Sequence, residues 1–530
     1  EPTLAVAITS TLLRENDAIN LRERTTGNGG GAMWDVVLSS SVTENGYDIV
    51  QCTGVPTLSL VRRDDWGSVG NLSTAYVFDT VADFKASLIV FPEGKLIEWQ
   101  GYYTNSDGGG SQGIVKSGVH TDDGGSVFTL ADGKYVAANL EGEKVNCRKF
   151  GVMPNMDGTT GMLNAIIYAK LIGNLVYVPA AMTIGDFYEV NAQMDLTACG
   201  IVGDGRDSSR IKTNSGTEPA ILHTGDGALT LYTVMKSIYI RNNGGTGDGV
   251  SWDLAPRHNY MTDVKIYGYA QGAAVRIKDS TWITDMDDVF LDNCKWGLYF
   301  DRSASIGSVG GSHTFRGGAI EGCERAFEGS VKNISFYGST IEGNQGIVET
   351  FSATTRVGGV CKLGIGEGPV AFYDCWMEGN GLPAIICGEG ATSEASATSQ
   401  ITVTGGRHEA EKLIWIRGTT SQISIKDINF DFTAIARNAL IWNDTKEARV
   451  LIENIRYRFD YQRLYDPYTY NYIPETVMLH EGGQVYFPSN ANGDHFAGGQ
   501  SQAKKTRLDN VSLTMVLDNF VQGNGLSRTF

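Results

Sequence analysis

Short stretches of alternating apolar and polar residues recur along the chain, and a three-residue signature aligns them. The signature occurs at Ile266-Tyr267-Gly268, Phe290-Leu291-Asp292, Ala319-Ile320-Glu321, Thr340-Ile341-Glu342, Trp376-Met377-Glu378, Arg407-His408-Glu409 and Asn429-Phe430-Asp431. Successive third positions are separated by 24, 29, 21, 36, 31 and 22 residues. Loops of variable length leave stacked strands in place, so this pattern predicts a coiled solenoid of parallel strands.

One helix is predicted before this array. Leu163, Ile166, Ile167 and Leu171 follow a helical period within Gly161 to Leu171, after a turn-forming segment. The strand Leu175-Val176-Tyr177-Val178-Pro179 comes directly afterwards. A single helix in this place fits a plug that covers the exposed first rung of a solenoid.

The chain divides into four predicted regions. Residues 1–78 and 79–143 form two small β modules, because Thr25, Gly30 and Val36 align with Thr104, Gly109 and Val115 at a constant offset of 79. The modules serve either as connectors to a larger assembly or as an N-terminal cap. The solenoid spans 144–448. A tyrosine-rich C-terminal β domain at 449–530 caps the solenoid or joins subunits.

Composition agrees with an all-β chain that has no nucleic-acid partner. The 530 residues include 66 Gly and 12 Pro, and the segments between glycines are rich in residues that favour strands. The net charge is −17, and no Lys/Arg-rich patch with interleaved aromatics occurs. If the substrate is acidic, local Arg and Lys must overcome this background.

The cysteine pattern and the hydropathy bear on location and cofactors. The eight cysteines form no CxxC pair, so free and mostly buried thiols are expected, without a zinc site or any other cofactor. The sequence contains no run of about 18 apolar residues, so no membrane-spanning helix is predicted. The first residues lack the basic start of a signal peptide, so we expect a soluble protein that reaches the cell exterior by another route, such as lysis.

Two passages of the chain are specific enough for comparison with a known family. Val145-Asn146-Cys147-Arg148-Lys149-Phe150-Gly151, with the turn, helix and strand that follow, and then Gly200-Ile201-Val202-Gly203-Asp204-Gly205 resemble the start and the next rung of the pectate-lyase-like β-helix found in bacteriophage tailspikes. Thr80-Val81-Ala82-Asp83-Phe84 and Asp107-Gly108-Gly109-Gly110 are similar to the small domain that often precedes it. Cys147, where the family usually has Val, and the altered turn Asn155-Met156-Asp157 are departures that touch no chemistry.

The resemblance implies a right-handed, single-stranded, pectin-lyase-like parallel β-helix. It also implies a homotrimeric protein of the virion tail that binds capsule or O-antigen polysaccharide at the host surface and depolymerises it. The N-terminal region would then attach to other tail proteins. Catalytic residues vary in place within this family, so the site has to be argued from local chemistry.

An acidic ladder is the strongest candidate site. The signature places Asp292, Glu321, Glu342, Glu378 and Glu409 at one outward position of successive rungs, since an apolar residue precedes each acid except Glu409. The residues can be solvated turn carboxylates, or a pair that cleaves a glycosidic bond. Neighbouring rungs fit the carboxyl spacing of a retaining glycosidase, and next-but-one rungs that of an inverting one.

Within the ladder, we predict Glu378 as general acid, Glu342 as base or nucleophile and Glu321 in support. Trp376 shares the strand face of Glu378 and can either stack on a sugar ring or be an ordinary surface aromatic. Asp292 and Glu409 would extend substrate binding. Whether the site lies within one subunit or between subunits stays open.

Alternative chemistries rest on weaker signals. His313 and Arg316 can supply the base and the charge neutraliser of a uronate lyase, although such residues are more often ordinary surface residues. Gly244-Gly245-Thr246-Gly247-Asp248 is similar to one calcium-binding nonapeptide, but a single copy is weak, so no metal site is predicted. A third possibility is an adhesin that binds glycan without cutting it.

Overall fold

A computed structural model describes the chain in part. The described residues are 18–23, 30–38, 49–51, 58–62, 75–140, 144–181, 183–225, 232–253, 258–278, 281–301, 311–329, 333–345, 348–351, 354–357, 360–363, 369–379, 384–387, 400–410, 412–416, 422–432, 439–443, 449–453, 456–458, 478–480, 484–486 and 514–515. The chain forms two compact units, Glu1–Asn139 and Leu140–Phe530.

The first unit contains two sheets with a common topology. One sheet has the order β1-β2-β4-β3 and the other β5-β6-β7-β9-β8. Their strands are β1 (Ala18–Glu23), β2 (Gly30–Leu38), β3 (Ile49–Gln51), β4 (Leu58–Arg62), β5 (Tyr76–Thr80), β6 (Leu96–Gly101), β7 (Ser111–Lys116), β8 (Val127–Thr129) and β9 (Tyr135–Ala138). The antiparallel order β1-β2-β4-β3 recurs as β6-β7-β9-β8, close to the predicted offset of 79.

The second sheet of this unit has an additional strand and helix at its start. Strand β5 pairs with β6 in parallel, and helix α2 (Val81–Ala86) connects them. Thr80 and Asp83 form a capping box at the start of α2, in which each side chain accepts a hydrogen bond from the other residue's backbone N–H. Phe84 and Trp99 pack in the core of this module.

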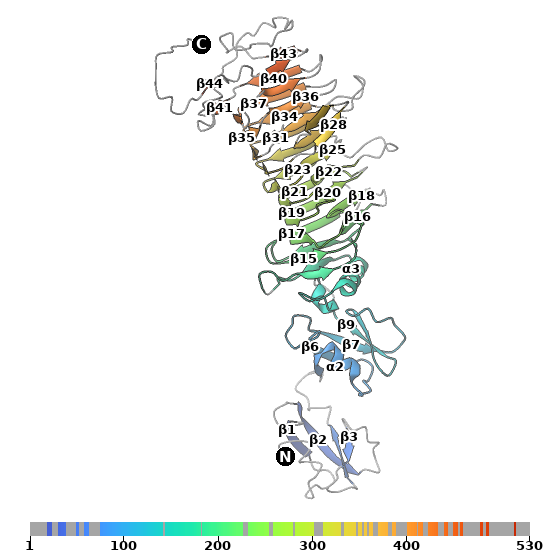
Figure 1. The fold of residues 1–530 in the computed structure, drawn as a ribbon. Coiled ribbons are helices and arrows are strands. Elements are labelled where there is room, and N and C mark those ends of the chain that lie inside the picture. Colours follow the sequence, from blue (N-terminus) through green and yellow to red (C-terminus); the bar gives the residue numbers. More distant parts are fainter. Residues whose placement is uncertain are drawn as a thin grey trace. The chain divides into compact units, whose positions relative to one another are not determined.

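The second unit begins with a short cap and one α-helix. Strand β10 and the 3₁₀ helix η2 (Cys147–Phe150) precede α3 (Thr159–Ile172), which confirms the predicted helix and extends it at both ends. It ends at Gly173, whose φ of 65° is the left-handed conformation favoured at a helix C-terminus. Figure 1 shows α3 beside the first rungs of the solenoid.

The buried face of α3 differs from the predicted one. Met162, Ala165, Ile166 and Ala169 are buried, whereas Ile167 and Leu171 are exposed. The apolar spacing in the sequence was carried by the larger side chains. In the structure, the close approach of the helix to the strands favours small residues, and Ala165 and Ala169 lie on the buried face.

The solenoid consists of two long parallel sheets, coloured from cyan through green and yellow to red in Figure 1. We call the 22-stranded one the long sheet and the 11-stranded one the second sheet. The long sheet contains β10 (Val145–Asn146), β11 (Leu175–Val178), β12 (Tyr188–Val190), β14 (Gly200–Gly203), β15 (Arg210–Thr213), β17 (Tyr232–Asn242), β19 (His258–Tyr267), β21 (Thr284–Asp292), β23 (His313–Arg316), β24 (Ala319–Glu321), β26 (Ile334–Tyr337), β27 (Thr340–Glu342), β31 (Pro369–Tyr373), β32 (Trp376–Glu378), β34 (Gln400–Thr404), β35 (Arg407–Ala410), β37 (Gln422–Lys426), β38 (Asn429–Phe432), β40 (Arg449–Glu453), β41 (Arg456–Arg458), β43 (Gln484–Tyr486) and β44 (Thr514–Met515).

The second sheet supplies the remaining strand of each rung. It contains β13 (Met194–Asp195), β16 (Ile221–Thr224), β18 (Val250–Asp253), β20 (Ala273–Ile277), β22 (Trp296–Phe300), β25 (Arg325–Gly329), β30 (Cys361–Leu363), β33 (Ile385–Cys387), β36 (Lys412–Ile416), β39 (Ala439–Asn443) and β42 (Met478–His480). The hairpin β28 (Val348–Phe351) and β29 (Thr354–Val357) lies outside both sheets. Successive rungs pair in parallel, so the expected all-β parallel β-helix is confirmed.

The strand pairing continues past residue 448. Strand β40 pairs in parallel with β37, and β43 pairs in parallel with β40. The described strands of the C-terminal region therefore add rungs to the solenoid. The tyrosine-rich segment from Tyr461 to Tyr472 lies outside the described residues.

The interior of the solenoid is apolar and stacked. Phe315, Phe336 and Phe372 occupy one inward position on successive rungs, and the last two rings stack at 4.9 Å. Seven of the eight cysteines are free and buried, as predicted: Cys147, Cys199, Cys294, Cys323, Cys361, Cys375 and Cys387. Cys52 lies outside the described residues. Among the described helices, none is long and apolar enough to cross a membrane.

Candidate functional site

A stacked backbone kink sets which side chains of the long sheet point outward. In eight successive rungs, from β17 to β38, a residue in the left-handed conformation divides the long-sheet segment in two, with φ between 52° and 70°. These kink residues are Ser237, Asp263, Asp288, Gly317, Gly338, Asp374, Gly405 and Asp427. Gly and Asp tolerate this conformation better than most residues, which explains their presence at this point. Alternation restarts after the kink, so the following outward positions fall into vertical columns.

The predicted acids share one of these columns. Asp292 pairs with Glu321, Glu321 with Glu342, and Glu342 with Glu378. The register of the next strand, with Met377 beside His408, brings Glu409 to the same position. The predicted vertical register is therefore confirmed, and adjacent rungs of a parallel sheet lie about 4.8 Å apart.

The first signature triplet was aligned wrongly by one residue. Tyr267, not Gly268, is the register partner of Asp292. Gly268 instead lies in the turn after the strand, with a φ of 84°. The column therefore continues from Asp292 to Tyr267 and then to Arg241.

His408 is no exception to the alternation. Leu291, Ile320, Ile341, Met377, His408 and Phe430 are all buried at the inward position before the acids or their equivalents. His408 Nε2 lies 3.0 Å from the carbonyl oxygen of Gly405. Burial lowers the pKa of His408 to about 4, so the ring is neutral at pH 7.

Glu321 has the perturbed carboxyl of this column. Burial, the charge of Asp292 and the charge of Glu342 together raise its pKa, in that order of size. Lys265 Nζ lies 3.0 Å from Asp292 Oδ2 and partly offsets the charge on that side. A carboxyl with a raised pKa next to a second carboxylate is the arrangement that separates an acid from a base.

Trp376 lies beside the acids on the outer surface. Its side chain is 42% exposed, and its indole Nε1–H donates a hydrogen bond of 2.5 Å to Glu378 Oε2. The Arg407 guanidinium lies over the Trp376 ring, 4.9 Å from its centroid. Arg407 also approaches Glu378 and Glu409, each at 3.9 Å. Glu378 is thus held as a hydrogen-bond acceptor, which fits binding better than the predicted acid role.

Two further aromatics lie on the other side of the kink. Tyr337 and Tyr373 occupy one outward position on adjacent rungs, and their rings stack at 4.9 Å. Tyr337 is 42% exposed. Tyr373 and Trp376 belong to one rung, three residues apart across the kink at Asp374. The signature missed this pair, because it covered only the strands that follow the kink.

The two residues predicted for a lyase, His313 and Arg316, differ in their exposure to solvent. His313 is 1% exposed, and its Nδ1 lies 2.9 Å from the Thr284 hydroxyl inside the solenoid. A surface-loop position for His313 is therefore wrong, and its ring has no access to a polymer on the outside. Arg316, on the same strand, points outward and lies 3.7 Å from Asp285.

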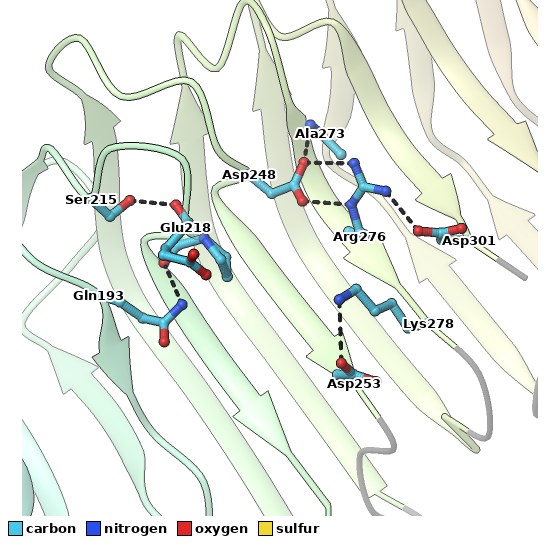
Figure 2. Close-up of polar contacts among 10 residues, drawn as sticks. Gln193, Ser215, Glu218, Asp248, Asp253, Ala273, Arg276, Lys278 and Asp301 are labelled. Carbon is cyan, nitrogen blue, oxygen red and sulfur yellow. Dashed lines mark hydrogen bonds and ion pairs between the residues drawn. The ribbon is translucent and has the colours of Figure 1, made fainter. Parts of the chain in front are cut away.

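The glycine-rich segment before Asp248 has a structural role. The Asp248 carboxylate accepts hydrogen bonds from Arg276 and from the backbone N–H of Ala273, as Figure 2 shows. Arg276 also donates to Asp301 at 2.8 Å. Both carboxylate oxygens of Asp248 are thus bound by protein groups, and the described residues contain no group of three or more His, Cys, Asp or Glu that could hold a metal ion.

Several solved structures share this fold. The gp42 tailspike of Acinetobacter phage vb_AbaP_AS12 aligns with a TM-score of 0.53 and 11% identity, over 86% of this chain and 78% of that one. The tailspike of Acinetobacter phage vB_ApiP_P1 aligns at 0.51 and 13%, over 86% and 76%. The enzymatically active domain of tailspike protein 4 from bacteriophage CBA120 aligns at 0.51 and 12%, over 92% and 63%.

The chain has the β-helix fold of phage tailspikes. Since the identities are 11 to 13%, the likeness concerns the fold alone. No protein-family model matches the chain, and no curated protein sequence matches it significantly.

Proposed function

We propose that this protein is a phage tailspike that binds a bacterial surface polysaccharide, capsule or O-antigen, and hydrolyses it internally. The observation that carries the proposal is the column of Glu321, Glu342 and Glu378 on adjacent rungs beside the exposed Trp376. The tailspike fold of the neighbouring structures supports it, as does the description of one of them as enzymatically active.

Glu321 and Glu342 are the pair best suited to the chemistry. Glu321, whose pKa is raised, donates a proton to the glycosidic oxygen, and the exposed Glu342 attacks the anomeric carbon. Neighbouring rungs lie about 4.8 Å apart, which fits the carboxyl spacing of about 5 to 5.5 Å in a retaining glycosidase. Glu378, Trp376 and Arg407 then bind the adjoining sugar, and Asp292 and Glu409 extend the surface.

The proposal also covers the assembly and its place on the virus. The working form is a homotrimer on the virion tail, with the N-terminal modules facing other tail proteins and the solenoid facing the host cell. Copies of a solenoid can bury their sides against one another in a closed symmetric assembly.

The test is to incubate the protein with a panel of purified capsules and O-antigens. We expect one polymer to be shortened with new reducing ends, and its first product to retain the anomeric configuration. Glu321→Gln and Glu342→Gln should each lower the rate by about 10²- to 10⁴-fold, since each removes one proton-transfer or nucleophilic group. Asp253→Asn, on the second sheet, is the control and should leave the rate unchanged.

Other results lead to other mechanisms. An inverted product would assign the base to Glu378, two rungs from Glu321. An unsaturated uronate at the new end would establish a lyase, and binding without shortening would establish an adhesin. Full activity in all three Gln variants, Glu321→Gln, Glu342→Gln and Glu378→Gln, would exclude this column as the catalytic site.

A further inference from the structure

The outward columns of the long sheet change in charge toward the start of the solenoid. The acid column runs from Glu321 to Asp292 and Tyr267 and reaches Arg241. The neighbouring outward column runs from Phe290 through Lys265 and Tyr239 to Arg210. A polymer that lies along the acids would therefore meet arginines and aromatic rings next.

Two guanidinium groups lie against one aromatic ring in this region. Arg210 lies 5.4 Å and Arg241 5.7 Å from the centroid of Phe187. Arg241 also lies 5.5 Å from the Tyr267 centroid, and Phe187 packs 5.8 Å from Tyr239. We call these five residues, Phe187, Arg210, Tyr239, Arg241 and Tyr267, the arginine patch.

The two arginines have no carboxylate partner among the described residues, although the chain has a net charge of −17. Arg210 donates one hydrogen bond to the carbonyl oxygen of Thr183. Its Nε has no hydrogen-bond partner, and the residue is only 7% exposed. Arg241 is exposed.

The surrounding cations differ from these two. Lys212 is paired with Glu189, Lys265 with Asp292, and Arg206 with Asp263 and Asp288. On the second sheet, Arg276 and Lys278 are likewise bound to carboxylates (Figure 2). The buried donor of Arg210 without a partner leaves unfavourable free energy that an anion would relieve, and the second guanidinium beside the same ring adds positive charge there.

We propose that the arginine patch is a subsite for an acidic sugar, whose carboxylate binds between Arg210 and Arg241. This inference rests on the proposed function, because it takes the ligand to be a glycan along the acid column. Arg241 lies three rungs before Glu321, roughly 14 Å along the axis. The glycan repeat unit then carries a carboxylate a few sugars away from the bond that is cut. The arginines orient the polymer, and the aromatic rings hold the guanidinium groups in place.

The test compares each polysaccharide of the panel in its native form and after chemical reduction of its carboxylates. Binding is measured by affinity electrophoresis with the whole 530-residue chain. We expect retention of acidic polymers, and a loss of about tenfold or more in affinity when their carboxylates are reduced. Arg241→Gln should weaken binding of the native polymer by a similar factor and leave that of the reduced polymer unchanged.

Two further variants separate charge from structure. Arg241→Lys keeps the positive charge and should restore part of the affinity, whereas Lys278→Gln on the second sheet should have no effect. Arg210→Gln is a second test, with circular dichroism used to check that this buried site still folds.

Three outcomes would overturn the inference: equal affinity for native and reduced polymers, unchanged binding in Arg241→Gln, or retention of no acidic polymer at all. Failure of the proposed function looks different. If an acidic polymer binds through Arg241 but is never shortened, the subsite stands and catalysis does not. If native and reduced polymers are shortened at the same rate, catalysis stands and the subsite does not.

Discussion

The outer faces of the two solenoid sheets treat charge in opposite ways. On the second sheet, cations and carboxylates alternate between rungs and bind one another, as Arg276 does with Asp248 and Asp301 (Figure 2). On the long sheet, carboxylates follow carboxylates from Asp292 to Glu378, and the paired Lys265 lies at one end of the series. The same backbone spacing therefore produces attraction on one face and repulsion on the other.

This difference indicates which face is structural. Opposite charges in cross-strand positions stabilise a sheet, and like charges destabilise it. The second sheet uses the first arrangement, and Asp248 and Arg276 are its most shielded partners. The long sheet keeps the second arrangement next to exposed Trp376 and Tyr337, which are suited to contact a ligand. Unfavourable free energy retained at such a surface is typical of a functional site.

Removing Arg276 from the second sheet should have the largest effect on stability. Arg276→Met leaves Asp248 without its bidentate partner in a mostly buried position. We expect the free energy of unfolding to fall by about 3 kcal/mol, with no loss of polymer cleavage in the folded fraction. Urea unfolding followed by tryptophan fluorescence measures this. Lys278→Met breaks an exposed pair and should lower stability by less than about 1 kcal/mol.

Acid should destabilise the solenoid interior through its buried histidines. Burial lowers the pKa of His408 and of His223 to about 4 in the folded protein. Each group binds a proton more weakly when folded, so its contribution to stability is present above the unfolded pKa near 6.5 and is lost as the pH falls toward 4. The loss can reach about 3 kcal/mol for each histidine.

A variant without the titrating ring tests this. The stability of His408→Leu should fall less steeply than that of the wild type between pH 6.5 and 4, even if the variant is less stable at pH 7. Equal slopes of stability against pH in the two proteins, between pH 6.5 and 4, would contradict the assignment. Glu378→Gln, on the outer surface of the same rungs, provides the matched control.

Trp376 should matter for substrate and little for folding. Trp376→Ala removes both the exposed ring and the hydrogen bond to Glu378. We expect KM to rise about tenfold, or roughly 1 to 1.5 kcal/mol, with a small change in kcat. Trp376→Phe keeps an aromatic ring but lacks the indole N–H, and its KM should lie between those of the wild type and Trp376→Ala. Tyr337→Ala tests whether the tyrosine pair across the kink belongs to the same surface.

The sequence predicted the acid column because the alternation of each strand is local. A single apolar residue before Glu321, Glu342 or Glu378 determines which way the acid points. The sequence did not reveal the kink residues, because they differ in type from rung to rung, as Asp288 and Gly317 do. They share only the left-handed backbone conformation. Gly268 was therefore taken as an equivalent of Asp292, one residue too late.

Burial and charge pairing were harder to predict. The prediction for His313 failed because its strand lies before the kink, where the inward and outward positions are set independently of the acids. The arginine patch was missed because its members do not repeat the signature. Arg210 and Arg241 become neighbours of Phe187 only through the packing of different rungs.

The smallest predicted effect on stability tests most directly whether the charges of the two sheets differ in this way. Glu342→Gln removes one of the charges that raise the pKa of Glu321. At pH 7 we expect this variant to be more stable than the wild type by about 0.5 kcal/mol, although we also expect it to cleave the polymer much more slowly. A raised pKa means that folding favours protonated Glu321, so the wild type regains this stability as the pH falls below the unfolded pKa of about 4.3.

The advantage of Glu342→Gln should therefore be greatest near neutral pH and vanish below about pH 4, and added salt should reduce it. Thermal unfolding of both proteins at several pH values measures this difference. The control is Asp253→Asn, which removes an attractive pair with Lys278 and should lower stability slightly instead. If Glu342→Gln were destabilising at pH 7, its carboxylate would be held by favourable contacts, and the two faces of the solenoid would not differ in the way that their charges suggest.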